Sequence, residues 1–467
     1  MFLATNLLYV IKHSVCLIHI LGIVLYAYGK YWIFGDFNLV LEEFLHKLSK
    51  KNILYVKLFQ ACALNNSLCI NINNININNI NNINNINNIN INNKLLQFCD
   101  SAPWTVADID IETLGELEAK YKLHIADKYQ PINAGMISLV YKCTKTSEAG
   151  TDNNTLIIKI KRKHIEQRLQ TAIEHVLFCL ALLDCIPYIN TYEFPAVVKK
   201  NIHLITQQVN FPNEVNNSEK FQRYCQRLTY IKIPKVYPEV TQEFNNVILM
   251  EYVQGKTLLN IHPVDREIYA KHLMKFVYIT CFLHGSYHGD LHVGNLLFLA
   301  DKQGQPQLGI IDFGLVYELE KTKDAVFDIL SSILLTPPEE LAEKILQSGL
   351  IEPITAIRAL NKEHYAHLIQ VLSHFIKQSV HVEKKLNHHQ VFTFMTELNA
   401  YITKTNINLN GLHLRISDDL IKIQVFFAMN HGVILTLCSE TNYIELSDQV
   451  MRETFHLDLF LWLIFYD

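Results

Sequence analysis

The fold is decided by His288-Gly289-Asp290-Leu291-His292-Val293-Gly294-Asn295, together with Ile311-Asp312-Phe313-Gly314 downstream. Asp290 and Asn295 are five positions apart, and Asp312 follows after an apolar run and a turn. In a protein-kinase-like active site, one carboxylate at this spacing orients or deprotonates the attacking hydroxyl, while an amide and a second carboxylate hold Mg²⁺. We therefore expect Asp290 to be catalytic and Asn295 and Asp312 to be the metal ligands.

A short hairpin is needed to bring these side chains together. Residues 296–299 and 308–311 both have the composition of brief buried strands, and the segment between them has the composition of a turn. The alternative is that His288 and Asp290 only cap a turn and that Asp312-Phe313-Gly314 ends an ordinary strand. The loop, the hairpin and the Asp-Phe-Gly together favour the active site.

The composition describes a large globular protein. The chain has 467 residues, 49% of them hydrophobic and 18% charged, which is enough for a sizeable core divided between two lobes. A formal charge of −4 gives no electrostatic basis for binding nucleic acid. The ten cysteines show neither a Cys-x-x-Cys pair nor metal-ligand spacing, so we expect reduced thiols in a reducing compartment.

The first 40 residues are strongly apolar. The continuous run over residues 14–28 is shorter than the ~20 residues that a membrane-spanning helix needs, although Lys12 and Lys30 could reach the interface from its ends. Three interpretations stay open at this point: a membrane anchor, a buried core helix and a signal peptide. Residues 70–93 contain only Ile and Asn, which indicates a low-complexity insertion looped out of the fold.

A nucleotide-binding small lobe is predicted from about residue 129. Residues 131–143 suggest strand, turn and strand, with Ala134 and Gly135 in the turn, and the strand over residues 156–160 carries Lys159. Backbone amides in such a turn face the phosphates, and the lysine reaches the α- and β-phosphates. Lys161 lies on the same face of the strand and is the rival for this role.

The remaining parts of a kinase-like site follow in order. Pro212 suits the first turn of a helix that begins near residue 211, and Glu214 is then placed to pair with Lys159. Residues 247–252 form a buried strand leading into the hinge, where backbone groups of Glu251 and Val253 would hold the adenine ring. A long apolar helix over residues 265–283 precedes the catalytic loop, and the sequence after Gly314 is nearly all helical.

These motifs resemble the UbiB/ADCK family of atypical protein-kinase-like proteins, over about residues 53–354. That family has a Lys-x-Gly-Gln motif in a helical N-terminal extension, and Lys57-Leu58-Phe59-Gln60 stands in its place with Phe59 for the glycine. The family's Glu-x-Asp pair is replaced by Gln208-Val209-Asn210, so that both carboxylates have become amides. Of the family's Ala-rich nucleotide loop only Ala134 matches. The family's five catalytic positions match in type and order: Lys159, Glu214, Asp290, Asn295 and Asp312.

The resemblance implies an α+β, bilobal protein-kinase-like fold and an atypical kinase or ATPase that uses ATP and Mg²⁺. It also implies a link to coenzyme Q and isoprenoid-lipid metabolism at membranes, with a lipid or protein as the unknown phosphoryl acceptor. The expected organisation is an apolar segment (1–40), a helical extension (41–128), a β-rich N-lobe (129–258) and a helical C-lobe (259–467). Two alternatives remain: a small-molecule kinase of the aminoglycoside or choline kinase type, and a non-catalytic nucleotide- or lipid-binding pseudokinase scaffold.

Overall fold

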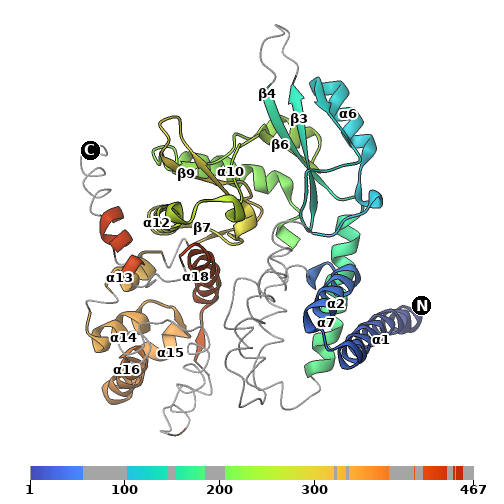
Figure 1. Cartoon of the computed structure of the whole chain (residues 1–467). Helices are drawn as coiled ribbons and strands as arrows, with labels where there is room; N and C mark the ends of the chain where they lie inside the picture. Colours follow the sequence, from blue (N-terminus) through green and yellow to red (C-terminus); the bar gives the residue numbers. More distant parts are fainter. Residues whose placement is uncertain are drawn as a thin grey trace.

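The computed structural model has two lobes, a small one built on an antiparallel sheet and a large one that is mostly helical (Figure 1). It describes residues 2–55, 102–145, 154–184, 206–319, 323–332, 336–377, 404, 414–438, 445–447 and 449–455. The predicted α+β kinase-like fold is confirmed. The Lys57–Gln60 motif and the Ile/Asn tract lie outside the described residues.

The small lobe is an antiparallel sheet with the strand order β1-β3-β4-β6, and β2 also pairs with β3. The strands are β1 (Leu123–Ile125), β2 (Asn133–Ala134), β3 (Ser138–Lys145), β4 (Asn154–Lys161) and β6 (Val247–Glu251). One face of the sheet is apolar, because Leu139, Leu156 and Ile158 are buried with the helix α6 (Ile111–Tyr121) packed on them. The sequence predicted that the small lobe begins at residue 129. β1 lies before that residue and is already part of the sheet.

Three further helices flank the sheet: α7 (Ile165–Asp184), α10 (Phe211–Tyr224) and α11 (Pro238–Glu243). α10 begins where the sequence predicted. The Asn210 side chain caps it by accepting a hydrogen bond from the Asn213 N–H at 3.1 Å, and Pro212 lies in its first turn. The amide at Asn210 therefore has a local structural role. The helix α7 was not predicted from the sequence.

The large lobe is organised around α12 (Arg266–Tyr278), which continues into a π-helical turn, η4 (Ile279–Leu283). This segment is buried on most sides, with Ala270, Leu273 and Phe276 fully enclosed. Beside it lie a three-stranded sheet, β5 (Ile231–Lys232), β9 (Pro306–Ile310) and β8 (Leu296–Ala300), and a two-stranded one, β7 (Ser286–His288) and β10 (Val316–Glu318). The hairpin β8–β9 matches the predicted one, whereas β10 lies in the part of the chain that was expected to be nearly all helical.

After β10, the described part of the large lobe is mostly helical, as Figure 1 shows. The helices are α13 (Lys323–Ser332), α14 (Pro338–Gln347), α15 (Ile354–Arg358), α16 (Lys362–Ile376) and α18 (Asp418–Leu437). A small pair of strands, β11 (Ile351–Glu352) and β12 (Arg415–Ile416), joins two of these segments. Short 3₁₀ turns complete the fold at Val106–Asp108 (η1), Leu258–Asn260 (η2), Pro263–Asp265 (η3) and Val293–Asn295 (η5).

The apolar N-terminal segment forms a single long helix, α1 (Phe2–Phe34), followed by α2 (Phe37–Lys51). Within α1, the stretch Ile11–Phe34 is long and apolar enough to cross a membrane, judged by length and composition alone. Only 6% of its most apolar part is buried. The helix is thus longer than the apolar run in the sequence suggested. α1 packs against α2 and α7, and all three lie together below the small lobe (Figure 1).

Candidate active site

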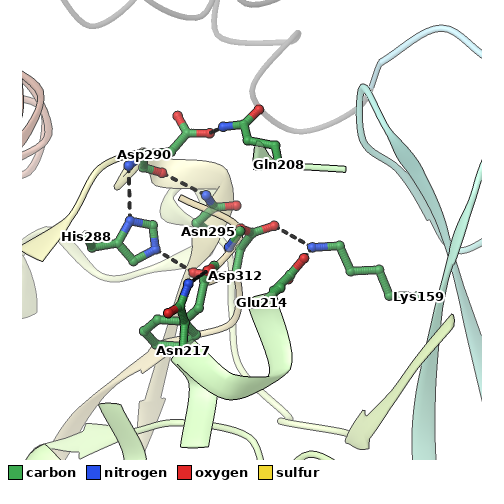
Figure 2. Close-up of polar contacts among 10 residues, drawn as sticks. Lys159, Gln208, Glu214, Asn217, His288, Asp290, Asn295 and Asp312 are labelled. Carbon is green, nitrogen blue, oxygen red and sulfur yellow. Dashed lines mark hydrogen bonds and ion pairs between the residues drawn. The ribbon is translucent and has the colours of Figure 1, made fainter. Parts of the chain in front are cut away.

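Lys159 connects the two lobes through a pair of carboxylates. Its Nζ lies 2.5 Å from Oε1 of Glu214 on α10 and 2.6 Å from Oδ2 of Asp312, which follows β9 (Figure 2). The side chains of Lys159 and Glu214 are 11% and 5% exposed, so both charges are largely removed from water. The structure therefore brings together a lysine, a glutamate and an aspartate that are far apart in the sequence.

The alternation of β4 leaves two lysines as candidates for this position. Leu156, Ile158 and Ile160 point into the apolar core, so Lys159 and Lys161 both leave the other face. Only Lys159 turns toward the carboxylates; the Nζ of Lys161 pairs instead with Glu166 at the start of α7, at 2.8 Å. Arg162, which follows the strand directly, is 3% exposed.

Burial and pairing act differently on the two carboxylates. Desolvation is the largest influence on Glu214 and raises its pKa to about 7, although Lys159 opposes this. Desolvation also acts on Asp312, but the charge and hydrogen bond of Lys159 and the Gly314 N–H outweigh it and hold the pKa of Asp312 below its usual range. The pKa of Lys159 is raised by both carboxylates against the effect of its burial. Of the two carboxylates, Glu214 is consequently the one that accepts a proton more readily.

His288 fixes the catalytic loop to the Asp-Phe-Gly segment. Its Nδ1 accepts a hydrogen bond from the Asp290 N–H at 3.1 Å, and its Nε2 is hydrogen-bonded to the carbonyl oxygen of Asp312 (Figure 2). This pattern corresponds to a neutral imidazole that carries its proton on Nε2. Phe313 packs on the His288 ring, with 5.4 Å between the ring centroids. One buried histidine thus holds both motifs in register.

Asn295 and Gln208 complete the surroundings of Asp290. The Asn295 amide nitrogen donates to the Asp290 carbonyl oxygen at 2.8 Å, which leaves its amide oxygen as the atom that a metal would use. The Gln208 Nε2 donates to Oδ2 of Asp290 at 3.0 Å (Figure 2). From the sequence, Gln208 was identified only as a departure from a family motif. Its hydrogen bond to Asp290 was not predicted.

One cleft of about 310 Å³ between the lobes contains every predicted site residue. Ala134 and Gly135 form its roof, and Glu251 and Val253 line it at the end of β6. The Glu251 carboxylate itself is paired with Lys232, at 2.7 Å, so only the backbone of this residue is suited to a role in the hinge. The cleft is lined by the following predicted residues: Ala134, Gly135, Lys159, Glu214, Glu251, Val253, Asp290, Asn295 and Asp312.

Comparison with known proteins identifies the family. Residues 94–345 match the model of the ABC1 atypical kinase-like domain, which is more than half of the chain. The chain belongs to the ABC1 atypical kinase-like family. This confirms the resemblance to UbiB/ADCK proteins and, at the level of the family, supports an atypical kinase-like function.

Relatives of this ABC1-family chain carry kinase names. It is 25% identical over 240 residues to the probable serine/threonine-protein kinase abkB of Dictyostelium discoideum, covering 48% of this chain and 34% of the relative. It is 23% identical to AarF domain-containing protein kinase 1 of Mus musculus, covering 59% and 51%. It is 25% identical to the probable protein kinase UbiB of Blochmanniella pennsylvanica, covering 47% and 41%. The chain thus matches about a third to a half of the length of these relatives.

Among solved structures, the chain is similar to Rv3197 from Mycobacterium tuberculosis in its complex with erythromycin. The TM-score is 0.43 at 14% sequence identity, and the alignment covers 75% of this chain and 83% of the other. This likeness is too distant to transfer a ligand or an activity.

The catalytic loop has a steric requirement at Gly289. A Cβ there would lie 2.3 Å from Cε2 of Tyr317 and 3.0 Å from Cγ of Leu315. We expect Gly289→Ala to lower the free energy of unfolding by ~1–3 kcal/mol, because the Tyr317 ring must move and is itself packed on Tyr287. Denaturant titration of the wild type and the variant measures this change in the free energy of unfolding.

Gly115→Ala is the matched control, because a Cβ at Gly115 in α6 meets nothing within 4 Å. Its replacement should be neutral or stabilising by ~0.5–1 kcal/mol. The double variant Gly289→Ala/Tyr317→Ala should cost less than the sum of the two single variants, since the clash is absent when Tyr317 is truncated. Equal costs for the two glycine variants would contradict the steric argument.

The raised pKa of Glu214 predicts a pH-dependent stability in the absence of Mg²⁺ and nucleotide. The folded chain binds the Glu214 proton more tightly than the unfolded chain, so stability falls as pH rises from the ordinary value of about 4.5 to about 7. We expect Glu214→Gln to stabilise the ligand-free protein at about pH 8, by at most ~3 kcal/mol. The gain should shrink toward about pH 5, as thermal melts in a chelating buffer would show.

The control is Glu166→Gln, which removes the exposed partner of Lys161. Its effect should stay within ~0.5 kcal/mol at either pH, because exposed ion pairs contribute little. If Glu214→Gln destabilised the protein at high pH, the ion pair with Lys159 would outweigh the burial of Glu214.

Proposed function

We propose that this chain binds Mg-ATP in the cleft between its lobes and hydrolyses it or transfers its γ-phosphoryl group to a lipid or protein acceptor. The observation that carries the proposal is the convergence of Lys159, Glu214 and Asp312 at 2.5 and 2.6 Å. A structural protein has no reason to bury a lysine between two carboxylates at the edge of a cleft, since such groups are costly to desolvate. The family match favours this proposal over the small-molecule kinase alternative.

The residues at the edge of the cleft fit a magnesium ion. Mg²⁺ prefers hard oxygen ligands, and Asn295 and Asp312 offer an amide and a carboxylate. Within the described part of the chain, no group of three or more His, Cys, Asp or Glu side chains could hold a metal alone. A magnesium ion would therefore depend on phosphate oxygens as well, which is the usual arrangement when the metal arrives with a nucleotide.

The roles of the other residues follow from their positions. The backbone of Ala134 and Gly135 covers the roof of the cleft, where amides can face phosphates. Lys159, braced by Glu214, supplies positive charge, and Asp290 orients a hydroxyl or water for in-line attack. Catalysis of this kind consists of positioning and charge neutralisation.

The nucleotide site is tested by thermal shift with Mg-ATP and Mg-ADP. We expect the wild type to gain ~2.7 kcal/mol at ~100 times the dissociation constant. Asp312→Asn and Lys159→Ala should lose most of that gain. Lys161→Ala is the matched control and should keep it, because Lys161 pairs with Glu166 outside the phosphate region. The absence of a shift with any nucleotide in the wild type would overturn the proposal.

Turnover separates an enzyme from a pseudokinase scaffold. Asp290→Asn should leave the Mg-ATP thermal shift intact and lower phosphate release or transfer by ~10²–10⁴-fold, the usual contribution of a positioned acid or base. A wild type that binds Mg-ATP but turns over no faster than Asp290→Asn would instead favour the scaffold.

We also propose that α1 contacts a membrane through its exposed face. Trp32 and Leu25 are 82% and 69% exposed, and the helix carries several more exposed apolar side chains. The opposite side of α1 is docked on the protein, because Tyr26 and Lys30 hydrogen-bond to Glu43 on α2. Since α2 carries charged side chains along the same length, the docked hairpin suits the bilayer interface better than a spanning position.

Vesicle co-sedimentation tests this contact. Replacing Trp32 and Leu25 together by Ser should weaken binding to phospholipid vesicles about tenfold or more, since ~1.4 kcal/mol of lost apolar burial corresponds to tenfold. Val264→Ser is the control, because Val264 is 75% exposed but lies on η3 in the large lobe. Equal binding of both variants would argue against a role for α1. Resistance of the wild type to alkaline extraction would indicate that the helix spans the bilayer instead.

A further inference from the structure

Arg162 is buried behind the nucleotide loop, on the side away from the cleft. It follows β4 directly, and its side chain is 2% exposed. Burial lowers the pKa of its guanidinium to about 10, which still leaves the group charged at neutral pH. A buried charge of this kind is tolerated only where it is well hydrogen-bonded.

The guanidinium joins two segments that are distant in the sequence. One terminal nitrogen donates to the Pro103 carbonyl oxygen at 2.7 Å and to Oδ2 of Asp108 at 3.2 Å. The other donates to the carbonyl oxygen of Gly135 in the nucleotide loop and, at 3.5 Å, to that of Ala102. Arg162 thus ties the loop to residues 102–108.

Backbone hydrogen bonds reinforce the same connection. The Ala102 N–H donates to the Ala134 carbonyl oxygen at 2.6 Å, and the Lys163 N–H donates to the Asp108 carbonyl oxygen at 2.8 Å. The Arg162 N–H itself donates to the Ile137 carbonyl oxygen at 2.9 Å, at the other end of the loop. Residues 102–108 therefore lie along the back of the loop whose front lines the cleft.

We propose that Arg162 is a positioning residue through which residues 102–108 set the shape of the nucleotide loop, so that displacement of this segment weakens nucleotide binding. The segment continues directly from the N-terminal part of the chain, and a partner that pulls on that part would act on the site through this link. The proposal rests on the Mg-ATP site proposed above, and it assigns a regulatory input to that site.

The chain offers a matched pair of variants. Asp108→Asn keeps the shape of the side chain but removes the charge that faces Arg162. Arg168→Gln removes the other arginine that is paired with Asp108; Arg168 is 46% exposed and, unlike Arg162, donates no hydrogen bond to the loop in the described part of the chain. Arg162→Gln removes the link itself, and Arg162→Lys keeps the charge without the forked geometry.

We expect Arg162→Gln and Asp108→Asn to weaken Mg-ATP binding, with Arg162→Gln costing about tenfold, since a charge-assisted hydrogen bond to the loop is lost. Turnover at saturating ATP should change less than about twofold, because Asp290 and Asn295 are not touched. Arg162→Lys should be intermediate, and Arg168→Gln should bind like the wild type. Affinities are measured with a fluorescent ATP analogue below the melting temperature of every variant.

Hydrogen exchange of the ligand-free protein tests the link without nucleotide. In Arg162→Gln, amides of residues 133–138 should exchange faster together with those of residues 102–108, whereas in Arg168→Gln the loop should remain as protected as in the wild type. Unchanged loop exchange and unchanged affinity in both Arg162→Gln and Asp108→Asn would overturn the inference. A wild type that binds no nucleotide would instead defeat the proposed function, even if the exchange result showed the mechanical link to be present.

Discussion

The site depends on one lysine that is held between two carboxylates. Lys159 comes from the sheet of the small lobe, Glu214 from α10 and Asp312 from the end of β9, so this contact links the small lobe to the large one. Two carboxylates beside one ammonium leave a net negative charge in a largely dry environment. Lys159 and the Gly314 N–H lower the pKa of Asp312 and keep it ionised, whereas burial raises the pKa of Glu214 and leaves it prone to protonation. Two carboxylates beside one lysine also favour additional positive charge, which a metal ion would supply.

The large lobe turns this contact into a defined geometry. The buried segment formed by α12 and η4 supports β7, and β7 pairs with β10 so that the strand residues flanking the catalytic loop and the Asp-Phe-Gly are opposite each other. His288 then hydrogen-bonds to both motifs from the interior. Packing of this kind is rigid, because the aromatic side chains of Phe221, Phe276 and Phe313 are fully or nearly fully buried against one another.

The small lobe is connected to the chain that precedes it more closely than a separate extension would be. β1 is part of the sheet, α6 covers its apolar face, and Arg162 binds residues 102–108 to the loop above the cleft. The N-terminal hairpin of α1 and α2 packs on α7, which begins just after Arg162. Contacts therefore run continuously from the N-terminal helices to the roof of the cleft, and they connect the site physically to the exposed apolar side chains of α1.

The sequence by itself determined the kinase-like fold and singled out the candidate site residues, because the order and spacing of Asp290, Asn295 and Asp312 leave few ways to bring them together. The alternation of β4 narrowed the strand lysine to two candidates, and only the tertiary structure chose Lys159, since the choice depends on where α10 and the start of α7 place their glutamates. β1 and β10 were missed because two- or three-residue strands have no periodicity to detect and form only where a partner strand is present. The contact of Gln208 with Asp290 and the burial of Arg162 could not be predicted from the sequence either. The role of a polar side chain depends on partners that only the tertiary structure brings close.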